Sequence, residues 1–334
     1  MSFIDTIYEK ARQNKKRIVI PECTNPSMMR SAVKAAADGT ADILFVGDVG
    51  ECKKTAVKNG IDLSGVTVIS TTDTAYQEKL VAMYAALPKK ILGKKYIANN
   101  ISVPLFMALV MEAVGETDCT FGGLDTTTTE FVLAASGVLG LAEGVISPSG
   151  MLIMEIDGYK GTQGNIFGMS DGAINTEPTS NQLAGIAISS CDTYTALTNR
   201  ESCCGLLSYS TCGSGDSPSV FRLREALEKA QTMRPDLKID GEFQADAAIV
   251  PRVAAKKVTR ESVVAGQANV LVFPDAAACN IATKLIQQFA PGRSYGPIYQ
   301  GFGKPVLDCS RGDTEERIYD NIAFCSVMAA GEDK

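Results

Sequence analysis

The residues from Arg17 to Gly47 read RIVIPECTNPSMMRSAVKAAADGTADILFVG and contain the repeating unit of the fold. Arg17 to Pro21 is a short apolar run ending in proline, which is typical of a buried strand. Ser27 to Asp38 has helical spacing of apolar residues, and Gly39 lies where a helix C-cap glycine is expected. Ala41 to Gly47 is a second apolar run. Because strand, helix and strand alternate, the segment predicts a parallel sheet with helices on both faces.

The same alternation extends along the rest of the chain, whose 334 residues indicate about two domains. We place the junction near residue 146. The remaining predicted elements are strands at 66–69, 118–123, 205–209, 247–250 and 270–274, helices at 103–114, 131–139 and 220–231, and a strand, turn and helix over 304–330.

Composition narrows the possible functions. The chain is 45% hydrophobic with a formal net charge of −6, which disfavours binding to nucleic acid or to an anionic membrane. No run is apolar over the length of a transmembrane helix, and the N-terminus has no signal-peptide core, so we expect a cytoplasmic protein. There is no histidine, which excludes Ser-His-Asp and Cys-His catalysis. The 10 cysteines have no CxxC spacing, and we predict reduced thiols and no metal site.

The most informative turn contains Ser310, Arg311 and Gly312. It follows the short predicted strand 305–307 and precedes a helix that opens with Thr314-Glu315-Glu316. Ligands of open α/β sheets bind beyond the carboxyl ends of strands, and a helix N-terminus offers free N–H groups to an anion. The guanidinium of Arg311 is a planar fork suited to phosphate. The alternative interpretation is a capped surface turn with a solvated arginine.

Three more turns at predicted strand ends are rich in hydroxyl, glycine or amide groups. Each could hold an anion through N–H and hydroxyl donors, and each could equally be an ordinary helix N-cap region. Together they indicate a polar, anionic small molecule as ligand. Their candidate binding residues are Thr126 and Thr127 in the first turn, Ser210, Thr211, Gly213 and Ser214 in the second, and Asn280 with Lys284 in the third.

At these same turns the sequence resembles the phosphate acyltransferase (phosphotransacetylase) family, and the resemblance runs nearly end to end. The motifs that carry it include DGAIN at Asp171, the STCGS turn at Ser210, and three longer stretches in the family's order. These are GEFQADAAIVPRVAAKKV from Gly241, VAGQANVLVFPD from Val264 and GPIYQGFGKPVLDCSRG from Gly296.

The resemblance implies an isocitrate-dehydrogenase-like α/β architecture, with two αβα domains, mainly parallel sheets and an active-site cleft between the domains. It implies that residues 300–334 return to an N-terminal domain of residues 1–146, with 147–299 as the second domain. A homodimer is the usual assembly. The implied reaction is acetyl-CoA plus phosphate giving acetyl phosphate plus CoA. CoA is then a substrate, and no tightly bound cofactor is expected.

The family's Ser-Arg-Gly turn carries a serine and an arginine of the reaction centre, which match Ser310 and Arg311, with Gly312 beside them. The family's catalytic aspartate falls on Arg317, and Glu316 is the nearest carboxylate. Further departures fall on Ser27, on or near Pro88, and on Val132, Asp125 and Cys212, where the family carries cationic residues or a histidine.

We therefore expect an acyl-CoA:phosphate acyltransferase with catalytic residues Ser310, Arg311 and Glu316. Its partners would be acyl-CoA, phosphate and acyl phosphate. The alternative is a catalytically weakened homologue that binds CoA or acyl phosphate, or that assembles with a pathway enzyme. A nicotinamide dehydrogenase is a distant third, because dinucleotide signatures are not apparent.

Overall fold

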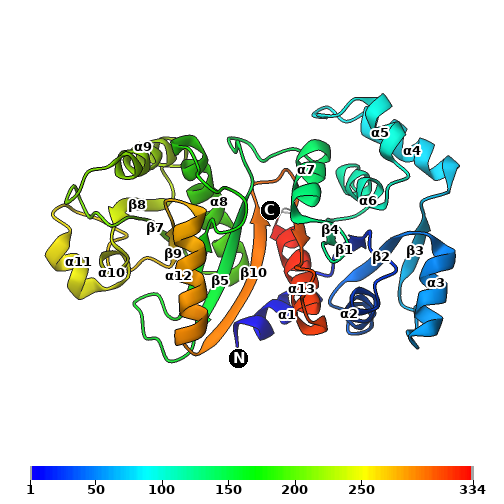
Figure 1. The fold of residues 1–334 in the computed structure, drawn as a ribbon, viewed down its shortest axis with the longest axis horizontal. Helices are drawn as coiled ribbons and strands as arrows, with labels where there is room; N and C mark the ends of the chain where they lie inside the picture. The colour runs from blue at the N-terminus through cyan, green and yellow to red at the C-terminus, as the bar shows by residue number, and fades with distance from the viewer. Residues whose placement is uncertain (1, 332–334) are drawn as a thin grey trace. The chain divides into compact units, whose positions relative to one another are not determined.

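The structure, a computed structural model, describes residues 2–331 and consists of two compact units (Figure 1). Unit 1 contains the residues up to Ala142 together with those from Phe302 onwards, and unit 2 is Glu143–Gly301. Both units are α/β, and most strand pairs are parallel. The predicted fold class is therefore confirmed. None of the helices within residues 2–331 has the length and hydrophobicity needed to cross a membrane.

Unit 1 is built on a five-stranded parallel sheet with the strand order β11-β4-β1-β2-β3. Helices α2 and α13 pack on each other and on the sheet, and α6 packs on β1, β2 and β4 together with α4 and α7. The elements of unit 1 are α1 (Phe3–Gln13), β1 (Arg17–Ile20), α2 (Pro26–Ala37), β2 (Asp42–Gly47), α3 (Val49–Lys58), β3 (Thr67–Ser70), α4 (Thr74–Ala85), α5 (Lys94–Asn100), α6 (Pro104–Ala113), β4 (Cys119–Gly122), α7 (Thr128–Val138), β11 (Val306–Asp308) and α13 (Glu315–Gly331).

Unit 2 contains a six-stranded sheet with the order β10-β5-β6-β9-β7-β8. The pairs that β5 forms with β10 and β6 are antiparallel, and the other three pairs are parallel. Its elements are β5 (Ser149–Ile156), β6 (Ile166–Ser170), α8 (Ser180–Thr198), β7 (Cys203–Leu207), α9 (Pro218–Met233), β8 (Lys238–Phe243), α10 (Ala245–Ile249), α11 (Pro251–Lys257), β9 (Val270–Val272), α12 (Ala276–Phe289) and β10 (Gly292–Gln300).

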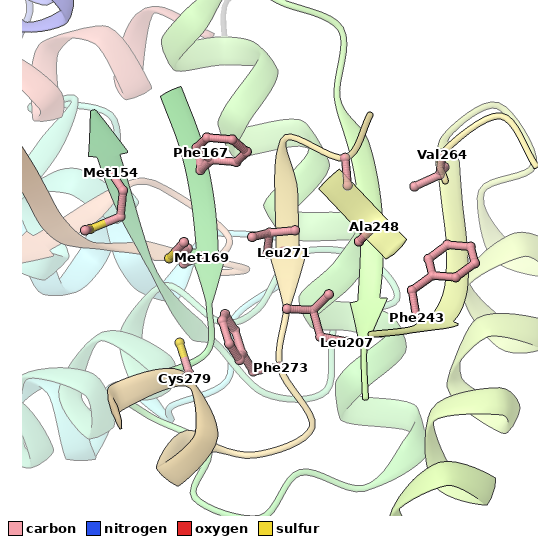
Figure 2. Packing of buried hydrophobic residues seen from close by; sticks show 11 residues of the cluster. Met154, Phe167, Met169, Leu207, Phe243, Ala248, Val264, Leu271, Phe273 and Cys279 are labelled. Carbon is pink, nitrogen blue, oxygen red and sulfur yellow. The ribbon is translucent and has the colours of Figure 1, made fainter. Parts of the chain in front are cut away.

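One core cluster of unit 2 explains how its helices are held on the sheet. Phe167, Met169 and Leu271 project from neighbouring strands, and Ala248 of α10 and Cys279 of α12 pack against the same cluster (Figure 2). Burial of such side chains stabilises the fold by roughly 25 cal/mol per Å² of apolar surface. The loops that follow these strands therefore start from rigid positions.

The predicted strand at Ala247–Val250 is wrong. These residues lie in and just after helix α10, and the strand of this region is β8, which the sequence analysis missed. A four-residue apolar run cannot distinguish a buried strand from a buried helix turn. One turn of helix buries the side chains of Ala247 and Ala248 as completely as a strand would.

Candidate active site

Three loops meet at the carboxyl edge of the sheet of unit 1, because β11, β4 and β1 are parallel neighbours. The register pairs Asp308 with Gly122, and the N–H of Cys309 donates to the carbonyl of Gly122 at 2.8 Å. Gly123 has φ +112°, and a Cβ there would lie 2.4 Å from the carbonyl oxygen of Cys309. A side chain at this position is therefore excluded, and the turn after β4 lies directly against the loop after β11.

The loop after β11 presents Ser310, Arg311 and Gly312 to solvent. Asp313 closes it, because its carboxylate accepts from the N–H of Ser310 at 2.9 Å and its own N–H donates to the carbonyl of Ser310 at 2.9 Å. Arg311 makes no ion pair with any other residue of the described range 2–331. An exposed guanidinium on a loop held by its own hydrogen bonds is available to an external anion.

Arg311 also lies near the first turn of α7. Hydrogen bonds from the hydroxyl and the N–H of Thr127 lower the pKa of Glu130, and the charge of Arg311 lowers it further. Thr127 and Glu130 form the capping box of α7. The structure thus brings together two of the predicted groups, the Ser310–Gly312 loop and the Thr126–Thr127 turn.

The turn at Thr126 already holds an internal anion. The carboxylate of Glu22, which is 5% exposed, accepts from four backbone N–H groups of residues 123–126 at 2.8, 2.9, 3.1 and 3.2 Å. No lysine or arginine pairs with Glu22 within residues 2–331. Glu22 is not among the site residues predicted above, although a carboxylate two residues after a buried strand is a recognisable signal.

Glu316 and Arg317 point to different neighbours from the first turn of α13. The pKa of Tyr8 is raised first by burial and then by Asp320, with a further contribution from the charge of Glu316, which therefore lies on the Tyr8 side of the helix. Arg317 reaches back to Asp313, with 3.8 Å between its Nη1 and the carboxylate. Consecutive helical residues point about 100° apart, which accounts for the divergence.

In unit 2 the predicted residues Ser210, Thr211, Gly213 and Ser214 form one turn after β7, again around a buried carboxylate. Glu242, 3% exposed, accepts from the hydroxyl of Ser210 at 2.8 Å and from the N–H of Gly213 at 3.0 Å. Arg224 donates to both of its oxygens, at 3.0 and 3.1 Å. Burial raises the pKa of Glu242, but the hydrogen bonds from Arg224, Gly213 and Ser210 outweigh burial and lower it to about 2.

Asn280 and Lys284 lie elsewhere in unit 2, exposed one turn apart on helix α12. The helix begins at the N-cap Asp275, whose carboxylate accepts from the N–H of Ala278 at 2.8 Å. Its strand, β9, is the neighbour of β7, so both loops belong to the same edge of the sheet. Within residues 2–331 no cluster of histidine, cysteine, aspartate or glutamate could hold a metal ion.

Comparison with known proteins identifies the family. Residues 2–326 match the family model described as phosphate acetyl/butaryl transferase. The chain is 36% identical to the phosphate acetyltransferase of Thermoanaerobacterium thermosaccharolyticum, over 98% of this chain and 100% of that one, and 36% identical to that of Clostridium acetobutylicum, over 98% and 99%. A phosphotransacetylase from Streptococcus pyogenes has the same fold, with a TM-score of 0.87 and 30% identity over 100% of both chains. This chain therefore belongs to the phosphate acetyl/butaryl transferase family.

Proposed function

We propose that the protein transfers an acyl group between CoA and phosphate, with acetyl-CoA plus phosphate giving acetyl phosphate plus CoA as the principal reaction. Family membership over nearly the whole chain supports this reaction. The observation that carries the proposal is the exposed, unpaired Arg311 within the described residues, beside Ser310 at the carboxyl edge of a parallel sheet.

In the direction of acyl-CoA synthesis, the CoA thiolate attacks the carbonyl carbon of acyl phosphate. A C–S bond forms, the C–O bond to phosphate breaks, and the thiol proton ends on the released phosphate or on solvent. Arg311 would bind the phosphoryl oxygens through its planar fork. The hydroxyl of Ser310 would donate to the oxygen on which negative charge develops in the transition state. CoA acts as a substrate, so the reaction needs no covalent enzyme intermediate.

The thiol needs a proton acceptor, since the thiolate is the nucleophile. We retain Glu316 as the proposed base. The alternative is that Arg317, which points to a different neighbour, lowers the thiol pKa by its charge without accepting the proton. Glu316→Gln should lower activity and move the pH–rate profile towards the thiol pKa. Glu315→Gln, which alters the neighbouring carboxylate paired with Arg30 at 2.7 Å, is the matched control. Equal pH profiles for the two variants would remove Glu316 from the mechanism.

The remaining predicted residues would contact substrate from the other turns. Thr126 and Thr127 would act through their hydroxyls, because Glu22 occupies the N–H groups of residues 123–126. The turn Ser210–Ser214 and the side chains of Asn280 and Lys284 would contribute further contacts, and Gly312 would keep the approach to Arg311 open. We further propose a homodimer located in the cytoplasm, as expected for an enzyme of soluble acyl metabolism.

The direct test is CoA-dependent release of phosphate from acetyl, propionyl and butyryl phosphate by the purified protein. We expect release with at least acetyl phosphate, together with a thioester absorbance signal of equal amount. Release of phosphate without thioester would indicate hydrolysis, and no release from any acyl phosphate would refute the proposed function.

A further inference from the structure

Unit 2 contains a pocket of about 490 Å³ that is lined by residues of α8, of α9 and of the first segment of the unit. Figure 1 shows α8 and α9 side by side, as their packing requires. Concave pockets of about 300–1,000 Å³ with mostly apolar linings and a few polar groups are the usual binding sites of small molecules. Among the residues that the structure describes, those that line this pocket include none to which we assign a part in acyl transfer.

The wall of the pocket supplies an apolar surface. Ala184 of α8 is 1% exposed, whereas Ile146 and Met233 are 57 and 47% exposed and so leave apolar area that a ligand could bury. Gly144 lies directly against Met233, since a Cβ at this glycine would be 3.0 Å from the Cε of Met233. A ligand that packs on Met233 would therefore also lie close to residues 144–146.

Lys229 is the one cation in the lining formed by the described residues, and its ammonium group is already fully hydrogen-bonded. Its Nζ donates to the hydroxyl oxygen of Ser180 at 2.9 Å, to the Oδ1 of Asn181, and to the carboxylate of Glu225 at 2.7 Å. An ammonium group has three donors, so no N–H of Lys229 remains for a ligand. An anion could bind at Lys229 only by displacing one of these bonds.

Glu228 leaves a negative charge at the pocket. Its side chain is exposed and forms no hydrogen bond or ion pair with residues 2–331. One turn later, the hydroxyl of Thr232 donates to the backbone carbonyl of Glu228 at 2.7 Å, so the hydroxyl oxygen can still accept a hydrogen bond. Because Glu225 neutralises Lys229, no cation among the described lining residues compensates the carboxylate of Glu228. The charge therefore favours a cationic ligand over a carboxylate or a phosphate.

We propose that this pocket binds small amphipathic amines, with the apolar body on Ile146, Ala184 and Met233 and the ammonium group at Glu228 and Thr232. The ammonium group would donate to the carboxylate and to the hydroxyl oxygen, which its three N–H groups allow. A bound amine would also hold residues 144–146 on α9. This binding goes beyond the proposed acyl transfer and does not depend on it.

Methyl NMR tests the binding with the intact protein. The chain contains 11 methionines, and Met233→Leu identifies the signal of Met233 in protein labelled at the methionine methyl groups. We expect 2-phenylethylamine to shift this signal saturably, while the signals of the buried core residues Met154 and Met169 stay unchanged. 2-Phenylethanol should bind about fivefold more weakly, and 3-phenylpropanoate more weakly still. No shift of Met233 with the amine, or equal affinity for the three compounds, would overturn the proposal.

Glu228→Gln isolates the contribution of the charge. Glu228 is exposed, so the fold should be retained, which circular dichroism verifies. We expect Kd for 2-phenylethylamine to rise about fivefold, to the value for the alcohol, and Kd for the alcohol to stay the same. Glu261→Gln, at an exposed carboxylate of unit 2 outside the pocket, is the control and should change neither value. Equal effects of the two variants on amine binding would contradict the assignment of Glu228.

Ile146→Ala isolates the apolar contact. Both the amine and the alcohol bury their ring on this side chain, so we expect Kd for both to rise about threefold. Val263→Ala, at a residue of unit 2 that is 61% exposed and outside the pocket, should leave both values unchanged. In the wild-type protein the amine should also slow hydrogen exchange of peptides that cover residues 144–146. Unchanged affinity of Ile146→Ala, or unchanged exchange in this segment, would show that the amine does not occupy this pocket.

Discussion

Glu22 in unit 1 and Glu242 in unit 2 are buried carboxylates that each hold the turn following a neighbouring strand, but they are stabilised differently. Glu22 accepts four backbone N–H bonds and has no cationic partner within residues 2–331. Glu242 accepts one N–H bond from that turn and one hydroxyl bond, and pairs with Arg224 through both oxygens. Backbone N–H groups thus stabilise the buried carboxylate of Glu22, whereas the guanidinium of Arg224 supplies much of this stabilisation for Glu242.

The comparison shows that the hydrogen-bond donors of turns rich in glycine and hydroxyl groups can be occupied by a carboxylate of the same chain. Their donors are the donors that would otherwise bind phosphate, and an internal carboxylate takes them. Arg311 differs from both turns, because its guanidinium forms no ion pair with the described part of the chain. We therefore expect changes at the two glutamates to affect stability and a change at Arg311 to affect the reaction.

The largest effect is expected for Arg311→Ala. Loss of one charge-stabilising donor costs about 3 kcal/mol in the transition state, so kcat/KM for acyl phosphate should fall by roughly 100- to 1,000-fold. The free energy of unfolding should stay within about 0.5 kcal/mol of wild type, because the side chain is exposed. Arg252→Ala, at an exposed residue of α11, is the control. Near-normal turnover of Arg311→Ala would show that this loop does not bind the substrate, and the proposed functional difference from the turns held by Glu22 and Glu242 would be wrong.

Glu242→Gln should be the most destabilising change at the filled turns. Removing the carboxylate leaves Arg224 without its bidentate partner, which costs about 3 kcal/mol because the carboxylate itself is buried. Hydrogen exchange of peptides covering β7 and its turn reports this locally, which avoids assuming that both units unfold together. The exposed ion pair of Glu225 with Lys229 offers the control Glu225→Gln, which is expected to have a much smaller effect because water already solvates both groups. Similar costs for both variants would show that the Glu242 network contributes little.

Arg224→Met makes the Glu242 turn resemble the Glu22 turn, with a carboxylate held by neutral donors only. We expect a smaller loss of stability than for Glu242→Gln, since Arg224 is 32% exposed and the bonds from Ser210 and Gly213 remain. The pKa of Glu242 is about 2, below that of the unfolded chain, so its stabilisation is present above pH ~4.3 and is lost as pH falls towards 2. In the variant the folded-state pKa of Glu242 should rise, so the acid-dependent loss of stability should be smaller and should be complete at a higher pH. Acid-unfolding curves of wild type and variant measure the shift, and superimposable curves would contradict the role of Arg224.

Glu22→Gln should have the smallest effect. The amide oxygen can keep the bonds from Gly123, Asp125 and Thr126, and only the bond from the N–H of Leu124 is exchanged for an unfavourable contact. The expected cost is about 1 kcal/mol, measured as faster hydrogen exchange at residues 123–126. Glu51→Gln, at an exposed ion pair of α3, should change nothing in this segment. A loss as large as that of Glu242→Gln would show that the charge of Glu22, and not the number of its bonds, stabilises the turn.

Much of the fold could be predicted because its signals are local. The apolar run at Arg17, the helical spacing from Ser27 and the second run to Gly47 correspond to β1, α2 and β2 with boundaries within two residues. β8 was missed because three of the six residues in its sequence, KIDGEF, are charged and a fourth is glycine, a composition that does not indicate a buried strand. Its burial comes from pairing with β7 and from Arg224 and Arg260, which neutralise Glu242 and Asp240.

The site was less predictable, because its partners are distant in sequence. The turns at Thr126 and Ser210 were recognisable from their hydroxyls and glycines. That Glu22 fills one turn and Glu242 the other depends on contacts across about 100 and 30 residues, which no local pattern encodes. Likewise, the sequence shows only that Asp313 is an acidic residue before a helix. It does not predict that the carboxylate of Asp313 accepts a hydrogen bond from the N–H of Ser310.

The order of the chain has a consequence for synthesis. Unit 1 receives β11 and α13 only after the roughly 160 residues of unit 2 have been translated. At a translation rate of about 5–20 residues per second, β11 is synthesised roughly 8–30 s after the first four strands of the sheet are complete. During this interval β4 is an open edge, with buried apolar side chains and unpaired backbone groups. The sequence of unit 2 is therefore complete before the Ser310–Arg311 loop exists, and β4 is exposed to pairing with other chains until β11 becomes available.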